Sequence, residues 1–530
     1  MADYDNENTA GSTRETNTGP HVSPHLSPRV SRRGFLAASA VGGVALGASL
    51  GLRAGAQSSG GSFGNSGAGG QGLEQEGVRR NIYAQMQTPE GQANIESYRR
   101  GVAAMKAKPF SDPTSWTFQA AIHDRATGRS VPELPEDIDG AIAALPPDLQ
   151  VVLGAANTCQ HHNNFFAFWH RMYLYFLEKN IRAASGDANF MLPYWNYSDS
   201  AAERAMPEPF RQPADRNTNA LYEDQRSAWA NNGDPVNPAW VSTSAAMGQA
   251  QAIAPAPDLG FYAQVERMPH DQVHGRIGGL MGRFNTAALD PIFWMHHCNI
   301  DRLWTKWIQA GHTDTNDPAI LGQRYRFIDD DGSIVTMSVL EVIGTGAQLG
   351  YVYDDDAGPE AGFVRAEASG TGVEGARLAD DLAVVNQGFT LGTAPVVAEA
   401  APVVEAAGAA LFTTDVSDPN ERPVYLVLEG VAHDDTVPVF YNIYVNRPDD
   451  VSVDPANGYF AGSYYPFSPT DDAGVSITFD ITGLLNRQVR DGIYEAGPLK
   501  VEILPELADT GGVEAGPIGA LTVGRIAIVR

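Results

Sequence analysis

The chain has 530 residues, of which 43% are hydrophobic and 19% are charged, a composition typical of a globular protein with more than one folded unit. Its formal net charge of -27 argues against nucleic acid as a partner, because phosphate binding requires a basic surface. Only two cysteines are present, so the sequence excludes a framework of disulfides.

The first predicted element is an export signal at residues 1–56. The sequence SRRGFL at residues 31–36 precedes an apolar run rich in Ala and Gly, which ends in AGA at residues 54–56. Twin arginines, an apolar run and an Ala-x-Ala site are typical of the Tat signal, which exports folded proteins. We therefore expect a periplasmic or extracellular protein with no stable membrane association after signal cleavage. A short membrane anchor is the alternative interpretation.

A flexible linker rich in Gly and Ser is predicted at residues 57–75, before a mainly helical domain at residues 76–356. Aromatic and aliphatic residues recur at helical spacing over 163–184. A further helix is expected to begin at Asp290-Pro291, because this pair is a common start signal. The segment RYRFIDDDGSIVTMSV, which follows, predicts two strands joined by a turn near Gly332.

A second linker is predicted at residues 357–410, because residues 393–410 are low in complexity. Beyond it, VYLVLEG, VFYNIYVNR, VSITFDI, LKVEILP and LTVGRIAIV are alternating, β-rich segments separated by turns. Short strands without intervening helices favour an antiparallel sandwich or barrel. The predicted fold is a mainly α core followed by a C-terminal antiparallel β domain at residues 411–530.

Histidine is unevenly distributed, since eight of the twelve histidines lie between residues 123 and 297. His270 and His274 are four residues apart, so on a helix both side chains project from the same face. His297, on the next long helix, can supply a third imidazole. A similar triplet lies earlier in the chain and consists of His123, His161 and His170.

Three neutral imidazoles per ion leave coordination positions open for an exogenous ligand. Ligation by nitrogen alone favours copper or zinc, whereas iron and manganese usually require carboxylate as well. Structural zinc sites are normally closed by four protein ligands, so two sites with open coordination positions indicate a catalytic role. A dizinc hydrolase is one alternative, although a bridging carboxylate is not evident.

The motifs around these histidines resemble those of the type-3 copper proteins, which are tyrosinases, catechol oxidases (polyphenol oxidases) and hemocyanins. The resemblance rests on His-x8-His followed by RMYLYFLE, on His-x3-His and on DPIFWMHHCNIDRLW, and it covers about residues 78–356. It implies a four-helix bundle that holds a dinuclear centre of two copper ions, with O2 as co-substrate. The implied ligands are His123, His161 and His170 for copper A, and His270, His274 and His297 for copper B.

The resemblance also bears on the neighbours of the ligands. In the two pairs of adjacent histidines, the spacing of the family's motifs selects His161 rather than His162, and His297 rather than His296, as the copper ligand. Cys159 has the spacing at which some members form a thioether with the residue that corresponds to His161. A free buried thiol and a disulfide with Cys298 remain alternatives.

Two structural roles are implied near the end of the helical domain. Tyr351 and Tyr353 resemble a Tyr-x-Tyr motif that contacts an N-terminal arginine, for which Arg79 and Arg80 are candidates. Asp301 and Asn299 could fix the tautomer of a ligand imidazole. A surface Asp301 paired with Arg302 or Lys306 is the alternative.

Three further residues concern the choice of substrate. Phe284 has the position at which plant catechol oxidases place a phenylalanine over copper B. Glu266 matches an acidic residue that holds a water molecule, and Asp271 stands where active tyrosinases often have asparagine. We therefore expect oxidation of small phenolic substrates, namely o-diphenols to o-quinones, with weak or restricted hydroxylation of monophenols. A true tyrosinase, an o-aminophenol oxidase and a hemocyanin-like oxygen carrier are the alternatives.

The C-terminal domain of plant and fungal members covers the active site, which implies possible intramolecular masking here. An aromatic side chain of that domain would then enter the pocket. Candidates are Phe440, Tyr441, Tyr444 and Tyr459. A purely stabilising β domain is the alternative.

Overall fold

The computed structural model describes residues 77–124, 134–155, 157–254, 259–356, 381–403, 423–470, 474–494, 497–509 and 521–530. These residues fall within one compact unit, Gln71–Arg530. The predicted signal peptide and the first linker lie outside the described residues. Within the described part of the chain, every helix is too short or too polar to cross a lipid bilayer.

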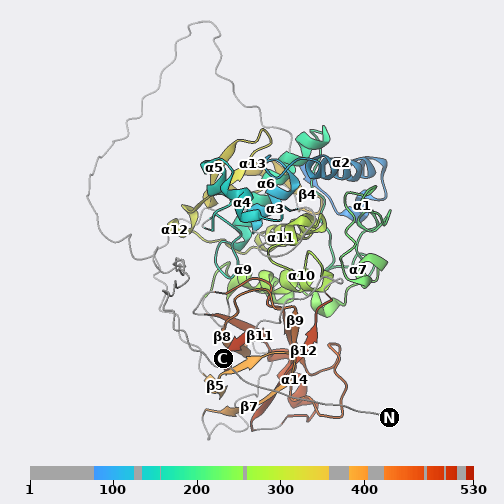
Figure 1. Cartoon of the computed structure of the whole chain (residues 1–530). Helices are drawn as coiled ribbons and strands as arrows, with labels where there is room; N and C mark the ends of the chain where they lie inside the picture. The colour runs from blue at the N-terminus through green and yellow to red at the C-terminus, as the bar shows by residue number, and fades with distance from the viewer. Residues whose placement is uncertain are drawn as a thin grey trace, which may run out of the picture. The chain divides into compact units, whose positions relative to one another are not determined.

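The histidine-bearing part of the chain is a helical core, as the sequence predicts (Figure 1). Its principal helices are α2 (Pro89–Lys106), α3 (Trp116–His123), α6 (Phe166–Ser185), α10 (Gln272–Ile277) and α11 (Ile292–Gln309). Helices α6 and α11 carry aromatic and aliphatic residues at helical spacing, so each buries a broad face against the other. The predicted start of α11 is confirmed, since an Asp290 carboxylate oxygen accepts a hydrogen bond from the Ile292 amide at 3.1 Å.

Shorter elements surround these helices. The remaining α-helices are α1 (Ile82–Gln85), α4 (Ile138–Ala143), α5 (Pro147–Val152), α7 (Ala228–Asn232), α8 (Ser244–Met247), α9 (Gly260–Val265), α12 (Pro318–Leu321), α13 (Gly346–Leu349) and α14 (Thr482–Arg490). The single-turn and irregular helices are η2 (Glu208–Phe210), η3 (Pro238–Trp240), η4 (Glu266–Asp271), η5 (Ala287–Leu289) and η6 (Val339–Val342). The predicted hairpin is confirmed as β2 (Arg324–Ile328) paired antiparallel with β3 (Ile334–Ser338).

A buried ionic network joins the start of the described chain to the end of the helical core. Strand β1 (Gly77–Arg79) pairs parallel with β4 (Tyr351–Tyr353). The Arg79 guanidinium lies 3.6 Å from the centre of the Tyr351 ring and donates to Glu178 at 3.0 Å. The expected contact between the Tyr-x-Tyr motif and an arginine is therefore confirmed for Arg79.

Asp301 belongs to the same network. Its carboxylate accepts hydrogen bonds from the hydroxyls of Tyr351 and Tyr353 at 2.7 and 2.6 Å and pairs with Arg171. Its side chain is only 3% exposed, so the alternative of a surface carboxylate is wrong. Asp301 fixes the closing strand of the core, and its hydrogen-bond partners include no ligand imidazole.

Loss of the Arg79 charge is expected to destabilise the core. In Arg79→Met, the carboxylates of Glu178 and Asp301 would lose a buried cation, which costs about 3–5 kcal/mol of unfolding free energy. Urea denaturation followed by circular dichroism measures this loss. The adjacent Arg80→Met is the matched control, because Arg80 is exposed and its replacement should change stability by less than about 0.5 kcal/mol. Equal urea concentrations at the midpoint of unfolding for the two variants would contradict the role given to Arg79.

The C-terminal part is an antiparallel sheet with the strand order β10-β9-β12-β7-β5-β14-β8-β11. These strands are β5 (Asp381–Val385), β7 (Val396–Pro402), β8 (Tyr425–Val431), β9 (Val439–Val445), β10 (Phe460–Tyr464), β11 (Val475–Asp480), β12 (Leu499–Leu507) and β14 (Arg525–Val529). A separate pair consists of β6 (Phe389–Leu391) and β13 (Leu521–Val523). The predicted fold class, a helical core followed by an antiparallel β domain, is confirmed.

The two edge strands of this sheet, β10 and β11, approach each other, so the sheet is nearly a closed barrel. Gly462 in β10 makes this approach possible, because a Cβ atom there would lie 2.4 Å from the Phe479 ring in β11. The barrel interior contains the buried faces of the strands, including Ile443, Val501 and Ile526.

The predicted linker at residues 357–410 is wrong over residues 381–402. This segment forms β5, β6 and β7, and β7 lies inside the sheet between β12 and β5. Its repetitive Ala/Val sequence suggested a linker, but small apolar residues are suited to a strand with neighbours on both sides. Ala400, for example, is fully buried.

Candidate metal centre

Two clusters of side chains that can ligate metal lie in the helical core. The first contains His123, Cys159, His161 and His170, and the second contains His270, His274, His296 and His297. Within each cluster the candidate ligand atoms lie within 4.8 Å of one another. All six histidines predicted as ligands are therefore brought together in two groups of three. Cys159 and His296 are the additional members.

Each cluster is assembled from separate elements. In the first, His123 ends α3, His161 lies in the loop before α6, and His170 is on α6. In the second, His270 is on η4, His274 on α10, and His296 and His297 on α11. Helical spacing fixes only the members that share a segment, and packing of α3, α6, α10 and α11 supplies the rest.

The two clusters are in contact. The rings of His170 and His297 stack with their centres 4.4 Å apart and their planes 13° apart. Across the second cluster, Nε2 of His274 lies 3.4 Å from Nε2 of His297. Metal ions bound in the two clusters would therefore be neighbours.

Hydrogen bonds orient the imidazoles through Nδ1. Nδ1 of His123 donates to the Phe284 carbonyl at 3.1 Å, that of His170 to the Phe166 carbonyl at 2.7 Å, and that of His274 to the Met281 carbonyl at 2.9 Å. A carbonyl oxygen can only accept, so Nδ1 carries the hydrogen in these three rings and Nε2 has a free lone pair. Nδ1 of His270 lies 2.9 Å from a carboxylate oxygen of Asp271.

The electrostatics of the clusters favour metal binding. Burial, rather than any one neighbour, lowers the pKa of His170 and His274 to about 3. Burial, followed by repulsion from neighbouring histidines, also places the pKa of the other four predicted ligands well below 6.5. The rings are therefore neutral, the state in which imidazole ligates metal.

The unpartnered atoms test whether a metal fits these clusters. Nε2 of His123, His161 and His270 is buried without a hydrogen-bond partner. Buried polar atoms normally have partners, so such atoms facing one another require an explanation. An ion ligated by nitrogen satisfies them, and this donor set suits copper or zinc.

Both cysteines are buried and free, so the alternative of a disulfide between Cys159 and Cys298 is not formed. The sulfur of Cys159 lies 3.2 Å from Nε2 of His170. Burial, followed by the nearby Glu266, raises the pKa of the Cys159 thiol well above 9. The thiol is therefore neutral, and the thioether with His161 stays a prediction.

His296 and His162 were expected to be neighbours of the ligands. Nδ1 of His296 lies 2.9 Å from the Tyr197 hydroxyl, and its Nε2 is buried without a hydrogen-bond partner, as in His123, His161 and His270. Nε2 of His162 lies 2.8 Å from the Ser468 hydroxyl of the β domain. Sequence spacing gave no indication of this second contact, because Ser468 follows 306 residues later.

The two acidic residues predicted at the site both lie beside it. Glu266 is 2% exposed, accepts a hydrogen bond from the His162 amide at 2.8 Å and lies 3.6 Å from Nδ1 of His161. Burial raises the pKa of Glu266, and burial together with the nearby Glu266 charge raises that of Asp271. Both carboxyl groups can therefore retain a proton more readily than a carboxyl group in water.

Phe284 was expected over the second cluster and instead contacts the first. Its ring centre lies 5.0 Å from that of His123 and 5.1 Å from that of His161. The physical reason is the hydrogen bond between its own carbonyl and His123, which fixes the Phe284 backbone beside α3.

An aromatic residue that the sequence analysis did not single out lies on the second cluster. Phe467 is fully buried, and its ring stacks on His274 with centres 4.1 Å apart and planes 24° apart. It belongs to residues 465–468, called here the plug segment, which follow β10. The aromatics named from the sequence lie elsewhere; Phe440, for example, packs against Arg276. Strand pattern alone could not identify Phe467, because a loop and the packing of the β domain on the core determine its place.

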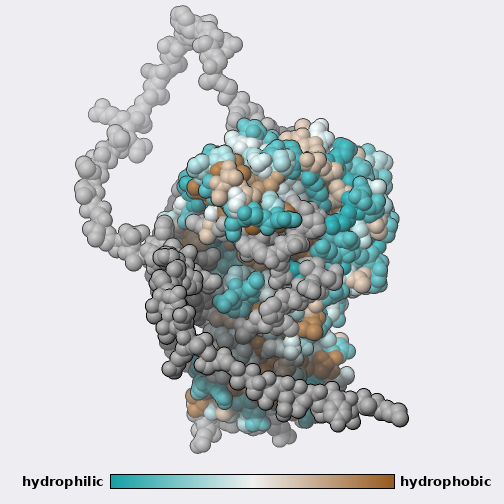
Figure 2. Space-filling model, in the orientation of Figure 1, coloured by the Kyte–Doolittle hydropathy of each residue, from teal (hydrophilic) through white to brown (hydrophobic). Residues whose placement is uncertain are grey.

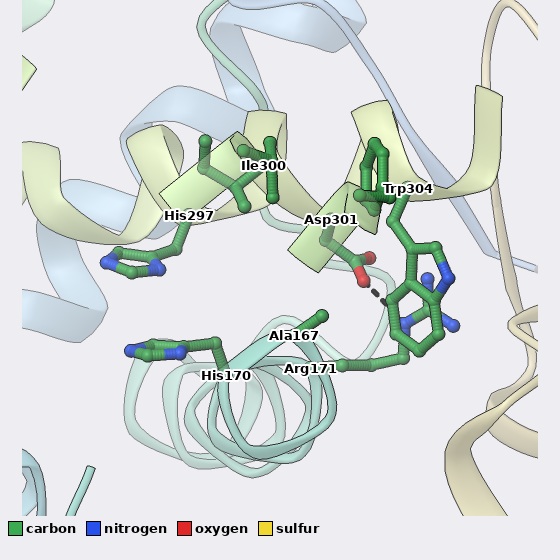
Figure 3. A pocket seen from close by; sticks show the side chains of 9 residues that line it. Ala167, His170, Arg171, His297, Ile300, Asp301 and Trp304 are labelled. Carbon is green, nitrogen blue, oxygen red and sulfur yellow. Dashed lines mark hydrogen bonds and ion pairs between the residues drawn. The ribbon is translucent and has the colours of Figure 1, made fainter. Parts of the chain in front are cut away.

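A small cavity adjoins the clusters on the side of His170 and His297 (Figure 3). Figure 3 shows His170 and Arg171 on one helix facing His297 and Asp301 on another, and Ala167, Ile300 and Trp304 also line the cavity. The cavity has room for about one water molecule, so it is not a phenol pocket. On the face drawn in Figure 2, the coloured surface is largely hydrophilic with scattered apolar spots, in keeping with buried clusters.

Comparison with known proteins gives a consistent result. The family model described as the common central domain of tyrosinase matches residues 113–251 and 212–310. The tyrosinase HcTyr1 of Hahella sp. (strain CCB-MM4) is 31% identical over 471 residues, which cover 81% of this chain and 95% of that protein. The chloroplastic polyphenol oxidase of Malus domestica is 28% identical over 70% of this chain and 66% of its own length.

Solved structures share the fold. A latent aurone synthase (polyphenol oxidase) aligns with a TM-score of 0.56 and 22% identity, over 86% of this chain and 89% of that chain. A latent apple tyrosinase aligns with a TM-score of 0.56 and 24% identity, over 86% of this chain and 97% of that chain. These alignments are too long to be confined to the helical core, so the similarity extends into the β domain.

Proposed function

Because the chain belongs to the tyrosinase and polyphenol oxidase family of oxidoreductases, we propose that it oxidises o-diphenols to o-quinones at a dicopper centre, with O2 reduced to water. The observation that carries the proposal is the pair of adjoining histidine clusters, in which Nε2 of His123, His161 and His270 is buried without a hydrogen-bond partner. His123, His161 and His170 would hold one copper ion, and His270, His274 and His297 the other.

The bound copper pair would supply the electron transfer between the diphenol and dioxygen. The protein supplies orientation and proton handling. Carbonyl acceptors keep Nε2 of three ligands directed at the metal positions, and Asp271 performs this function for His270. Glu266, beside His161 and with a raised pKa, can accept and hold a proton that a phenol hydroxyl releases.

The preference for diphenols over monophenols rests on two residues. The Phe284 ring lies against His123 and His161 and narrows the approach to the first cluster. At residue 271 the chain has aspartate, whose carboxylate is already engaged by His270 and cannot offer the N–H of an asparagine.

Rates with a monophenol, a catechol and an o-aminophenol on copper-loaded protein test this preference. Oxidation that is fastest for the catechol and free of a lag supports the proposal. Fast hydroxylation of the monophenol would identify a true tyrosinase. Fastest oxidation of the o-aminophenol would identify an o-aminophenol oxidase. Reversible oxygen binding without quinone would indicate a carrier.

Masking by the β domain is a second part of the proposal. Phe467 stacks on His274, where the ring of a bound phenol would be expected, and contacts from its neighbours support this position. The Tyr465 hydroxyl donates to the Gly282 carbonyl at 2.7 Å, and Ser468 contacts His162. The solved structures of similar fold are described as latent enzymes, which also supports masking over a purely stabilising role.

Export and cross-linking complete the proposal. The twin arginines at residues 32–33 support export by the Tat route to the periplasm or the exterior. The position of Cys159 within the first cluster supports a thioether with His161.

Replacement of Phe284 by alanine is expected to relax the selectivity. The smaller side chain opens the approach beside His123 and His161, so the ratio of kcat/KM for a monophenol to that for a catechol should rise about tenfold. Steady-state kinetics with tyramine and 4-methylcatechol give this ratio. The copper content of the variant is the control. It should equal that of the wild type, because alanine keeps the backbone carbonyl that accepts the hydrogen bond from His123. An unchanged ratio at full copper content would remove the role of the ring.

A further inference from the structure

The main chain of Phe284 connects a predicted copper ligand to the β domain. Its carbonyl accepts from Nδ1 of His123 at 3.1 Å, and its amide donates to the Thr436 hydroxyl at 3.2 Å. The same hydroxyl donates to the Phe467 carbonyl at 2.6 Å. An uninterrupted series of hydrogen bonds therefore runs from His123 through Phe284 and Thr436 to Phe467.

Phe284 lies in a segment that the β domain contacts at further points. We call residues 278–286 the gate loop. The Tyr465 hydroxyl donates to the Gly282 carbonyl, and a Cβ atom at Gly278 would lie 2.0 Å from the carbonyl oxygen of Asp509. The β domain therefore contacts the gate loop at its beginning, its middle and near its end.

We propose that Thr436 is a positioning residue that links the plug segment to the gate loop, so that withdrawal of Phe467 and release of Phe284 occur as one event. The inference rests on the proposed masking of the site by the β domain. In this arrangement, the covered state both fills the space over His274 and holds the carbonyl that orients His123. Withdrawal of Phe467 would admit the phenol and, in the same event, release the carbonyl that orients His123 in the first cluster.

The chemistry of Thr436 suits this role. A hydroxyl can accept from one amide and donate to one carbonyl at the same time, which neither an apolar nor a purely donating side chain can do. Thr436→Val keeps the shape and removes both bonds, whereas Thr436→Ser keeps both. The pair of variants therefore separates the hydrogen bonds from side-chain packing.

The first experiment uses the full-length, metal-free protein. Amide hydrogen exchange is measured by mass spectrometry on the fragment that contains Phe284. Loss of two neutral hydrogen bonds should speed exchange there roughly tenfold in Thr436→Val, with wild-type exchange in Thr436→Ser. Thr390→Val is the matched control, because Thr390 is an exposed threonine of the β domain and its replacement should leave this fragment unchanged.

The second experiment uses the copper-loaded, uncleaved chain. Thr436→Val should oxidise 4-methylcatechol roughly tenfold faster than wild type and release copper to a chelator with one faster phase, corresponding to the first cluster. Thr436→Ser should oxidise 4-methylcatechol and release copper at the wild-type rates. A change in melting temperature alone, without these responses, would show that Thr436 only stabilises the domain.

Two outcomes distinguish this inference from the proposed function. Slow, unaltered exchange at Phe284 in Thr436→Val would overturn the link, even in a protein that oxidises catechols. Faster exchange in a protein that oxidises no phenol when loaded with copper would support the contact and overturn the oxidase proposal instead.

Discussion

Replacement of Phe467 by alanine in the full-length chain is expected to raise kcat/KM for catechol by about 10–100-fold. The ring lies on His274, and under the proposed masking a phenol binds only in the fraction of molecules from which the ring has withdrawn. The apparent affinity is reduced by that fraction, and removal of the ring removes the reduction. Oxygen uptake with catechol as the variable substrate measures the effect on uncleaved, copper-loaded protein.

Phe479→Ala is the control for this variant. Phe479 is also a buried phenylalanine of the β domain, but its ring packs beside Gly462 and against the guanidinium of Arg267 rather than on a histidine. Each replacement should cost about 3–5 kcal/mol of stability. Only Phe467→Ala should gain activity. Equal activity of Phe467→Ala and wild type would rule out masking by this ring, and an equal gain in Phe479→Ala would indicate general loosening of the domain.

His297→Asn is expected to lose one copper ion per chain and to lower catechol oxidation by at least about 10³-fold, because the proposed oxidation requires both ions. The adjacent His296→Asn should retain both ions and lose about 10–100-fold at most, as is usual for a residue that only supports a ligand. His297 is chosen over His296 by the ligand spacing of the family and by its Nε2, which lies 3.4 Å from that of His274. The Tyr197 hydroxyl holds Nδ1 of His296, and this variant tests whether the His296 ring only supports the site.

Elemental analysis and oxygen uptake on the two purified variants give both quantities. The pair is matched in residue type, in helix and in burial, so instability affects both alike. Loss of copper from His296→Asn with retention in His297→Asn would reverse the assignment. Retention of two ions in both variants would show that neither histidine is essential for binding.

The sequence allowed part of each histidine cluster to be predicted from local spacing, and the family motifs supplied the remaining members. His270 and His274 share one helical face, and the motif around His297 identifies its helix. The antiparallel β domain was equally accessible, since alternation of apolar residues is a property of each strand. The boundaries of that domain could not be predicted from the sequence, because the Ala/Val segment at 393–402 becomes a strand only through its pairing between β12 and β5.

Other features depend on contacts between distant segments. Phe467 reaches His274 from a loop 193 residues further along the chain, and no pattern around either residue signals the contact. Asp301 was predicted from its distance to His297 along one helix. Its partners, Arg79, Arg171 and the two tyrosines of β4, approach from three other segments.

The place of β5 in the sheet has a consequence for proteolysis. The strand begins at Asp381 and pairs with β14, which ends at Val529, so the first and last strands of the sheet are neighbours. A protease that cuts between Asp356 and Asp381 would therefore leave every strand of the sheet on the same side of the cut. A cut at residues 404–422 would leave β5, β6 and β7 covalently attached to the helices, and the remainder could depart only by breaking the sheet apart.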